Sequence, residues 1–135
     1  MADVFALQGA ASSGKSDTLI RLLEALEAKY PRAIKETLHH GKDVKVILRG
    51  VNGMVVGIES QGDPNSRLEE SLEGFKKAKC DIIFCACRTR GMTVGWVNSL
   101  SPKYHIHFVA QTYTNSSRAA SNAAMASSLM QMAGL

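Results

Sequence analysis

The strongest candidate for a binding site in this sequence lies between Gly9 and Ser16. This stretch reads GAASSGKS and matches the pattern G-x-x-x-x-G-K-[ST] at every fixed position. Glycines let a backbone turn so tightly that successive N–H groups point at one anion. Lys15 supplies a mobile cation for phosphate oxygens, and the Ser16 hydroxyl is a suitable magnesium ligand. The predicted phosphate-binding residues are Gly9, Ala10, Ala11, Ser12, Ser13, Gly14, Lys15, Ser16 and the adjoining Asp17.

A predicted strand precedes this stretch and a predicted helix follows it. Residues 4–7 form an apolar run that predicts a buried strand, and residues 17–27 carry leucines at helical spacing. A helix that begins near Lys15 and ends near Tyr30 would point its positive end at the anion. Over these first 30 or so residues the chain resembles the P-loop NTPase superfamily. The resemblance implies a nucleoside triphosphate and Mg²⁺ as ligands.

The rest of the chain predicts an α/β fold. Strands are expected at residues 44–48, 54–58, 82–87 and 106–110, helices at 68–79, 94–100 and 115–133, and a connecting region at 34–42. Asn52-Gly53 between two apolar runs favours an antiparallel hairpin, and the continuous apolar run 82–87 favours a strand buried on both faces. We therefore expect one domain over residues 1–135, a three-layer sandwich with a five-stranded, mainly parallel sheet. The phosphate loop would follow strand one, and strands two and three would form the hairpin.

The turn after residue 58 suggests further site residues. P-loop proteins hold Mg²⁺ with an acidic residue at the end of a strand, and Glu59 follows the apolar run of residues 55–58. Glu59 is therefore a predicted metal ligand, together with Ser16. Glu59 and Lys15 are also predicted catalytic residues. Small GTPases have a hairpin and then D-x-x-G, and this chain has Glu59-Ser60-Gln61-Gly62 there. The chain is thus similar to the GTPase-kinase branch. Gly62 becomes a nucleotide-binding candidate, and Asp63, where many GTPases carry a water-orienting glutamine, a catalytic one.

Arg88 and Arg90 follow the buried strand 82–87, whose carboxyl end should point into the nucleotide cleft. An arginine there could neutralise charge on the transferring phosphate, hold an acceptor phosphate, or only bond loop carbonyls. At the end of the last predicted strand, residues 111–115 lack the guanine-reading motif [N/T]-K-x-D. Thr112 and Tyr113 are the predicted nucleotide contacts there. We expect ATP as the ligand, or loose selectivity for the base.

Composition excludes several other functions. The net charge of +4 is mild and aromatic residues make up 6%, so a nucleic-acid partner is not expected. No long apolar run or basic N-terminal leader is present, which predicts no membrane span and no cleaved signal peptide. Three clustered cysteines, Cys80, Cys85 and Cys87, are expected to be reduced core residues of a cytoplasmic protein. Small residues and methionines in the last helix could contact a protein partner or a second copy of the chain.

Three functions stay open at this stage. The first is an ATP-hydrolysing regulatory or assembly switch, which the hairpin and the short chain favour. The second is a small kinase that transfers the γ-phosphoryl group to a metabolite or nucleotide, which suits Arg88 and Arg90. The third is an interaction module that binds nucleotide with negligible turnover, since no residue is an unambiguous catalytic base.

Overall fold

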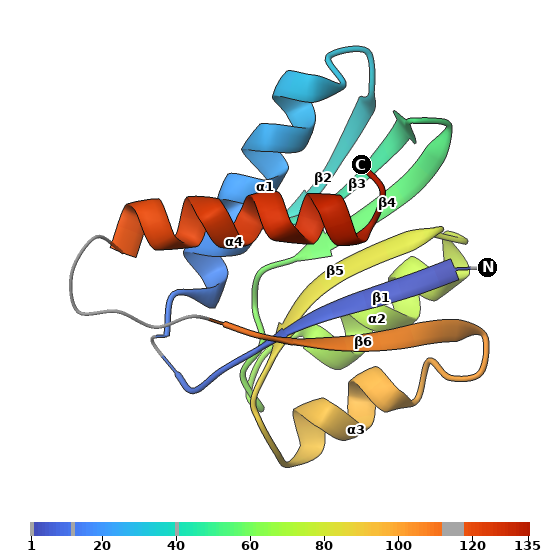
Figure 1. Cartoon of the computed structure of the whole chain (residues 1–135). Coiled ribbons are helices and arrows are strands. Elements are labelled where there is room, and N and C mark those ends of the chain that lie inside the picture. The colour runs from blue at the N-terminus through green and yellow to red at the C-terminus, as the bar shows by residue number, and fades with distance from the viewer. Residues whose placement is uncertain (1, 12, 40, 112–117) are drawn as a thin grey trace.

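The computed structural model describes residues 2–11, 13–39, 41–111 and 118–135. Within these ranges the fold is α/β, with four helices and one mixed sheet of six strands in the order β2-β3-β4-β5-β1-β6 (Figure 1). The elements are β1 (Ala2–Gln8), α1 (Lys15–Lys29), β2 (Ile34–His39), β3 (Lys45–Val51), β4 (Met54–Glu59), α2 (Leu68–Lys77), β5 (Ile82–Cys87), α3 (Met92–Asn98), β6 (Tyr104–Ala110) and α4 (Arg118–Met132).

The pairing of the strands confirms the predicted hairpin. β3 pairs antiparallel with β4, and the turn between them has positive φ at Asn52 (53°) and Gly53 (79°), as a tight two-residue hairpin requires. β1 pairs in parallel with both β5 and β6, and β4 pairs in parallel with β5. Every residue of β5 is buried, as its continuous apolar run predicts.

The prediction of five strands is wrong by one, because part of the expected connecting region 34–42 forms β2. This strand pairs antiparallel with β3 at the edge of the sheet, and all six of its residues are exposed. An exposed edge strand has no buried face, so its sequence IKETLH shows no apolar alternation. Its hydrogen bonds to β3, which no local pattern encodes, make it a strand.

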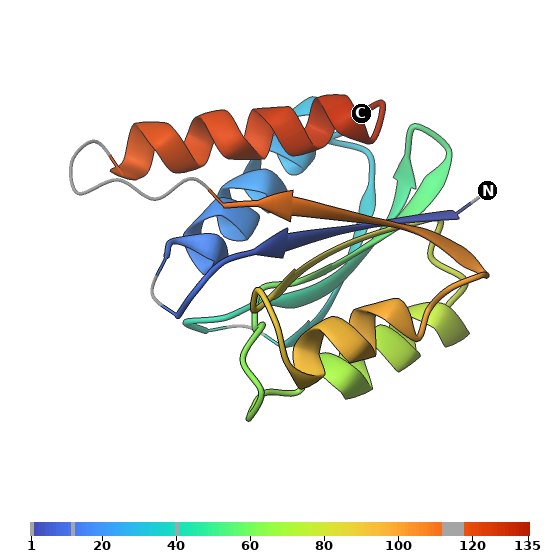
Figure 2. The same cartoon turned by 60° about the horizontal axis from the view of Figure 1, so that its bottom comes forward.

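Helices cover both faces of the sheet (Figure 2). α1 and α4 pack together over one face, and α2 and α3 over the other. Alternate residues of the buried strands contribute to the two cores: in β1, Phe5 and Leu7 face α1, whereas Val4 and Ala6 belong to the opposite core. Gly57 in β4 lets α2 approach closely, because a Cβ there would lie 2.8 Å from the ring of Phe75.

This topology brings several loops to one edge of the sheet. The parallel strands β1, β4, β5 and β6 all end there, so the segments after each of them meet. Because β3 runs antiparallel to β4, residues just before β3 reach the same edge. None of the described helices is long and apolar enough to cross a membrane.

Candidate functional site

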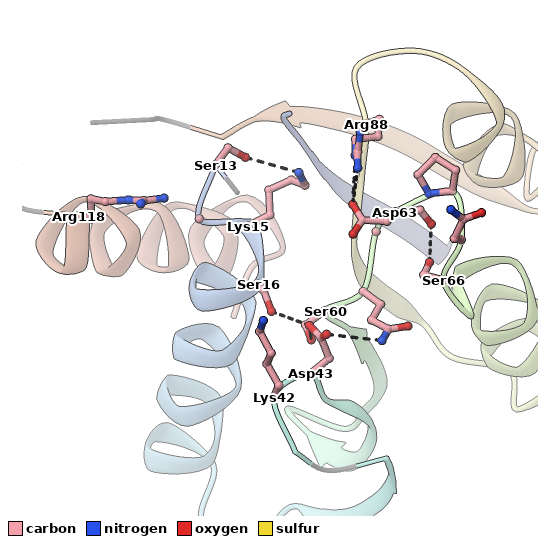
Figure 3. A pocket seen from close by; sticks show the side chains of 15 residues that line it. Ser13, Lys15, Ser16, Lys42, Asp43, Ser60, Asp63, Ser66, Arg88 and Arg118 are labelled. Atoms are coloured by element: carbon pink, nitrogen blue, oxygen red, sulfur yellow. Dashed lines mark hydrogen bonds and ion pairs between the residues drawn. The ribbon is translucent and has the colours of Figure 1, made fainter. Parts of the chain in front are cut away.

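A polar cavity of about 600 Å³ lies at this edge (Figure 3). Its walls are residues 13–16 at the start of α1, residues 42–43 before β3, residues 60–66 after β4, and the side chains of Arg88 and Arg118. The volume is in the range of small-molecule sites. Four cationic side chains line it against two carboxylates, Asp43 and Asp63, so the cavity suits an anion; the cations are Lys15, Lys42, Arg88 and Arg118.

The loop between β1 and α1 is shaped around the ammonium group of Lys15. Lys15 Nζ donates to the carbonyl oxygens of Gly9 and Ala10, each at 2.7 Å, and lies 3.5 Å from Ser13 Oγ. Gly14 has φ of 96°, and a Cβ on Gly9 would lie 2.5 Å from Ser13 Oγ, so both glycines are required for this turn. Burial lowers the pKa of Lys15, with Asp63 raising it and Arg88 lowering it further.

Asp43 is the carboxylate that meets Ser16. Ser16 Oγ donates to Asp43 Oδ1 at 2.7 Å, Ser60 Oγ donates to the same oxygen at 3.0 Å, and Gln61 Nε2 lies 3.5 Å from the other oxygen. Burial favours the neutral acid, but these hydrogen bonds outweigh it and lower the pKa of Asp43 below its ordinary value. Asp43 is therefore charged at neutral pH and lies beside the predicted magnesium ligand.

Sequence reasoning missed Asp43 because it belongs to no motif and lies 27 positions from Ser16. The signal that could have found it is the hairpin itself. An antiparallel β3 must begin where β4 ends, so residues just before β3 are brought to the carboxyl ends of the parallel strands.

Glu59, predicted as a metal and catalytic residue, is not brought to the cavity. Its side chain has no exposed surface and points to the α2 side of the sheet. There it accepts hydrogen bonds from Arg67 Nε (2.7 Å) and Nη2 (3.0 Å), from Ser71 Oγ (2.6 Å) and from the Gln61 N–H (3.0 Å). Successive side chains of a strand alternate between faces, so Glu59 and Ser60 diverge and only Ser60 reaches Asp43.

Asp63 and Arg88 meet at the cavity wall. Arg88 donates from Nη2 at 2.9 Å and from Nε at 3.1 Å to Asp63 Oδ1. Gly62 is needed before Asp63, because a Cβ there would lie 2.5 Å from the backbone of Ala86 at the end of β5. Arg90, by contrast, is exposed and is not part of the cavity wall. The structure thus brings Arg88 to the site and leaves Arg90 outside it.

Asp17 faces α4 instead of the cavity. Its carboxylate accepts from Arg21 Nε at 2.7 Å and from Asn122 Nδ2 at 2.9 Å. Asn122 Oδ1 accepts from Gln111 Nε2 at 2.8 Å, and Gln111 Oε1 accepts from Thr18 Oγ1 at 3.1 Å. This network ties the start of α1 to the end of β6 and to α4. The predicted contacts Ser12, Thr112 and Tyr113 lie outside the described residues.

Cysteine and histidine do not build a site in the described part of the chain. The structure buries all three cysteines, Cys80, Cys85 and Cys87, and none of them forms a disulfide bond with another described residue. Burial raises the pKa of Cys87 to about 11, as expected for a thiol in the core. No group of three His, Cys, Asp or Glu side chains among the described residues could hold a metal ion. At the cavity, the Ser16 hydroxyl and the neighbouring Asp43 carboxylate are oxygen groups of the kind that Mg²⁺ prefers as ligands.

No protein-family model, curated protein or solved structure matches this chain. The geometry of the cavity and the sequence motif that forms one of its walls are therefore the observations that bear on function.

Proposed function

We propose that this chain is a small P-loop nucleoside triphosphatase, with the three-layer sandwich fold of that superfamily, that binds ATP with Mg²⁺ and hydrolyses it as a regulatory or assembly switch. The observation that carries the proposal is the convergence of Lys15, Ser16 and Asp43 in one cationic cavity at the carboxyl edge of the parallel strands. Ligands of α/β proteins bind at this edge. The β3–β4 hairpin supports the GTPase-kinase branch, and three free thiols agree with a cytoplasmic location.

The phosphate loop fits a polyphosphate chain. Lys15 Nζ bonds two loop carbonyls, a position from which a short rotation of its flexible stem carries the charge to a bound phosphate. The N-terminal turn of α1 adds unpaired N–H groups and the positive end of the helix dipole. Gly9 and Gly14 allow the tight turn of the loop, because a Cβ there would lie too close to Ser13 or Asn122, and in such a turn successive backbone N–H groups can point at the anion.

The oxygen-rich corner at Ser16 fits the cation. Ser16 would hold Mg²⁺ directly, and Asp43 would orient Ser16 through the hydrogen bond of 2.7 Å. When bound, Mg²⁺ would neutralise negative charge on the phosphate oxygens. Glu59 has no part in this arrangement, because its carboxylate is enclosed by Arg67 and Ser71.

Asp63 and Arg88 are the groups suited to act on the transferring phosphate. Arg88 can release the exposed Asp63 and donate hydrogen bonds to phosphate oxygens instead. This contact would strengthen in the transition state, because negative charge spreads over the oxygens of the transferring phosphate. Asp63, with its side chain 61% exposed, can then accept a hydrogen bond from the attacking water and orient it.

A kinase is the second candidate, and the extent of the cavity favours it. The cavity continues past Lys15 along residues 63–66, which leaves a wall on which an acceptor could bind beside Arg88. A nucleotide-binding module without turnover remains the third, because Asp63 is the single carboxylate placed to contact an attacking water along the described cavity wall.

A turnover assay separates these functions. Phosphate release from Mg-ATP by the protein alone supports hydrolysis, phosphate transfer to an added hydroxyl acceptor supports a kinase, and binding without turnover supports the module. Arg88→Ala should lower kcat about tenfold or more with little change in ATP affinity, whereas Arg90→Ala, the matched control outside the cavity, should leave kcat unchanged. Equal kcat values for both variants would remove Arg88 from the mechanism.

A further inference from the structure

Arg118 is a cavity residue that no motif predicts. It begins α4, more than one hundred positions from Lys15, yet its side chain lines the same cavity. In Figure 3, Arg118 extends from α4 toward the loop that carries Ser13 and Lys15, on the side away from Arg88. In this view the two arginines lie on either side of Lys15, so cationic groups are spread along the cavity, where several phosphates of a polyanion could each bind one.

The helix that carries Arg118 is held against the phosphate loop by a buried amide. Asn122 is one turn further along α4, on the same helix face, and is 4% exposed. Its Nδ2 donates to Asp17 at 2.9 Å, and its Oδ1 accepts from Gln111 at 2.8 Å. A Cβ on Gly14 would lie 3.0 Å from this amide, so α4 and the loop are in close contact there.

The charges near Asp17 agree with this placement. Burial alone would raise the pKa of Asp17, but hydrogen bonds from Arg21 and Asn122, together with the charges of Arg21 and Arg118, lower it. Arg118 is therefore close enough to the start of α1 for its charge to act on groups of the loop region.

From this geometry we infer that Arg118 binds the phosphate chain of the nucleotide on the side of Lys15 opposite to Arg88, and that Asn122 is the positioning residue that fixes α4 for this contact. The inference rests on the proposed function, since it requires a polyphosphate in the cavity. It also gives α4 a role in ligand binding, although α4 lies outside the motif of residues 9–16. Arg118 contributes to affinity, and Arg88 to turnover.

Calorimetric titration of the full chain with Mg-ATP and with magnesium tripolyphosphate tests the inference. Arg118→Ala should weaken both ligands about tenfold or more, and Arg118→Lys should recover part of the loss, because the contact is to phosphate charge. The control Arg32→Ala, an exposed arginine beyond the far end of α1, should bind both ligands as wild type does. A loss for ATP but not for tripolyphosphate would contradict a phosphate contact.

A double-mutant cycle tests the role of Asn122. Asn122→Ala should weaken binding less than Arg118→Ala does, and the double variant should lie within about twofold of Arg118→Ala, because Asn122 acts through Arg118. If the fold-losses in affinity of the two single variants multiply in the double variant, Asn122 does not act through Arg118 and the positioning role is wrong. If Asn122→Ala does not fold, Asn122→Ser replaces it in the cycle.

The titrations distinguish failure of the proposed function from failure of the inference about Arg118. If wild type binds neither ligand, the proposed function fails. If wild type binds both and Arg118→Ala equals wild type, the nucleotide site stands and the inference about Arg118 is wrong.

Discussion

One oxygen of the Asp43 carboxylate accepts hydrogen bonds from two hydroxyl groups, those of Ser16 and Ser60. One hydroxyl belongs to the first turn of α1 and the other to the segment after β4. Asp43 therefore connects the start of α1 with the segment after β4 through a single charged group. At this position a negative charge can compensate a divalent cation next to Ser16.

We predict that Asp43→Asn lowers turnover about tenfold or more and raises the Mg²⁺ concentration needed for half-maximal activity. The amide keeps the shape of the side chain but removes the charge that favours the cation. Phosphate release measured over a range of Mg²⁺ concentrations gives both numbers. Glu24→Gln, an exposed change in the middle of α1, is the control. An unchanged Mg²⁺ requirement in Asp43→Asn would contradict the role of Asp43.

Glu59 has a structural role that predicts a different phenotype. Glu59→Gln leaves the guanidinium of Arg67, 19% exposed, without its charged partner. Loss of one partner of a buried ion pair should reduce the free energy of unfolding by about 3 kcal/mol. Urea denaturation measures this change, with the exposed Glu69→Gln as the control. A variant of wild-type stability would show that Arg67 does not depend on Glu59.

Among the elements, the segment between β4 and α2 forms one wall of the cavity and is fixed at both ends. Arg67 bonds Glu59 across the base of the segment, and the Arg67 N–H donates to Gln61 Oε1 at 3.3 Å. Near its middle, Gly62 packs directly against the backbone of Ala86. The conformation that places Gln61 and Asp63 in the cavity thus depends on this close contact.

Gly62→Ala should displace the segment, because the added Cβ would meet the Ala86 carbonyl at 2.5 Å. We predict a loss of kcat of about fivefold or more, since a shift of about 1 Å near the reacting groups is costly. Gly74→Ala is the matched control: no atom lies within 4 Å of the added Cβ in α2, and alanine should raise stability by about 0.5–1 kcal/mol. Steady-state kinetics and urea denaturation of both variants provide the test, and normal kcat in Gly62→Ala would contradict it.

The sequence allows the buried elements and the position of the turn between β1 and α1 to be predicted, but not the contacts that depend on how distant segments of the chain pack together. β5 and the β3–β4 hairpin are confirmed because their signals are local: continuous apolar character and an Asn-Gly turn. β2 was missed because its strand character comes from pairing with β3 alone. Glu59 was misplaced because an apolar run shows where a strand ends but not which face its last residue occupies. Asp43, Arg118 and Asn122 reach the site through topology that no local motif records.

The whole molecule determines which nucleotide the cavity accepts. The cationic side chains of the described cavity wall are lysines and arginines, which can attract phosphate groups but do not distinguish one base from another. We predict that ATP binds at least as well as GTP, because the guanine-reading motif is missing from residues 111–115. Parallel calorimetric titrations with the two nucleotides measure the ratio. A preference for GTP above about tenfold, roughly 1.4 kcal/mol, would contradict this prediction.

The proposed function requires that the cavity bind a nucleoside triphosphate through Lys15. Calorimetric titration of Mg-ATP into wild type and into Lys15→Ala tests it most directly, with Lys103→Ala, an exposed lysine before the amino end of β6, as the control. We predict that wild type and Lys103→Ala bind with equal affinity and that Lys15→Ala binds at least about tenfold more weakly, because the bound phosphate loses its charged partner. Equal affinity in wild type and Lys15→Ala, or no binding by wild type, would contradict the account.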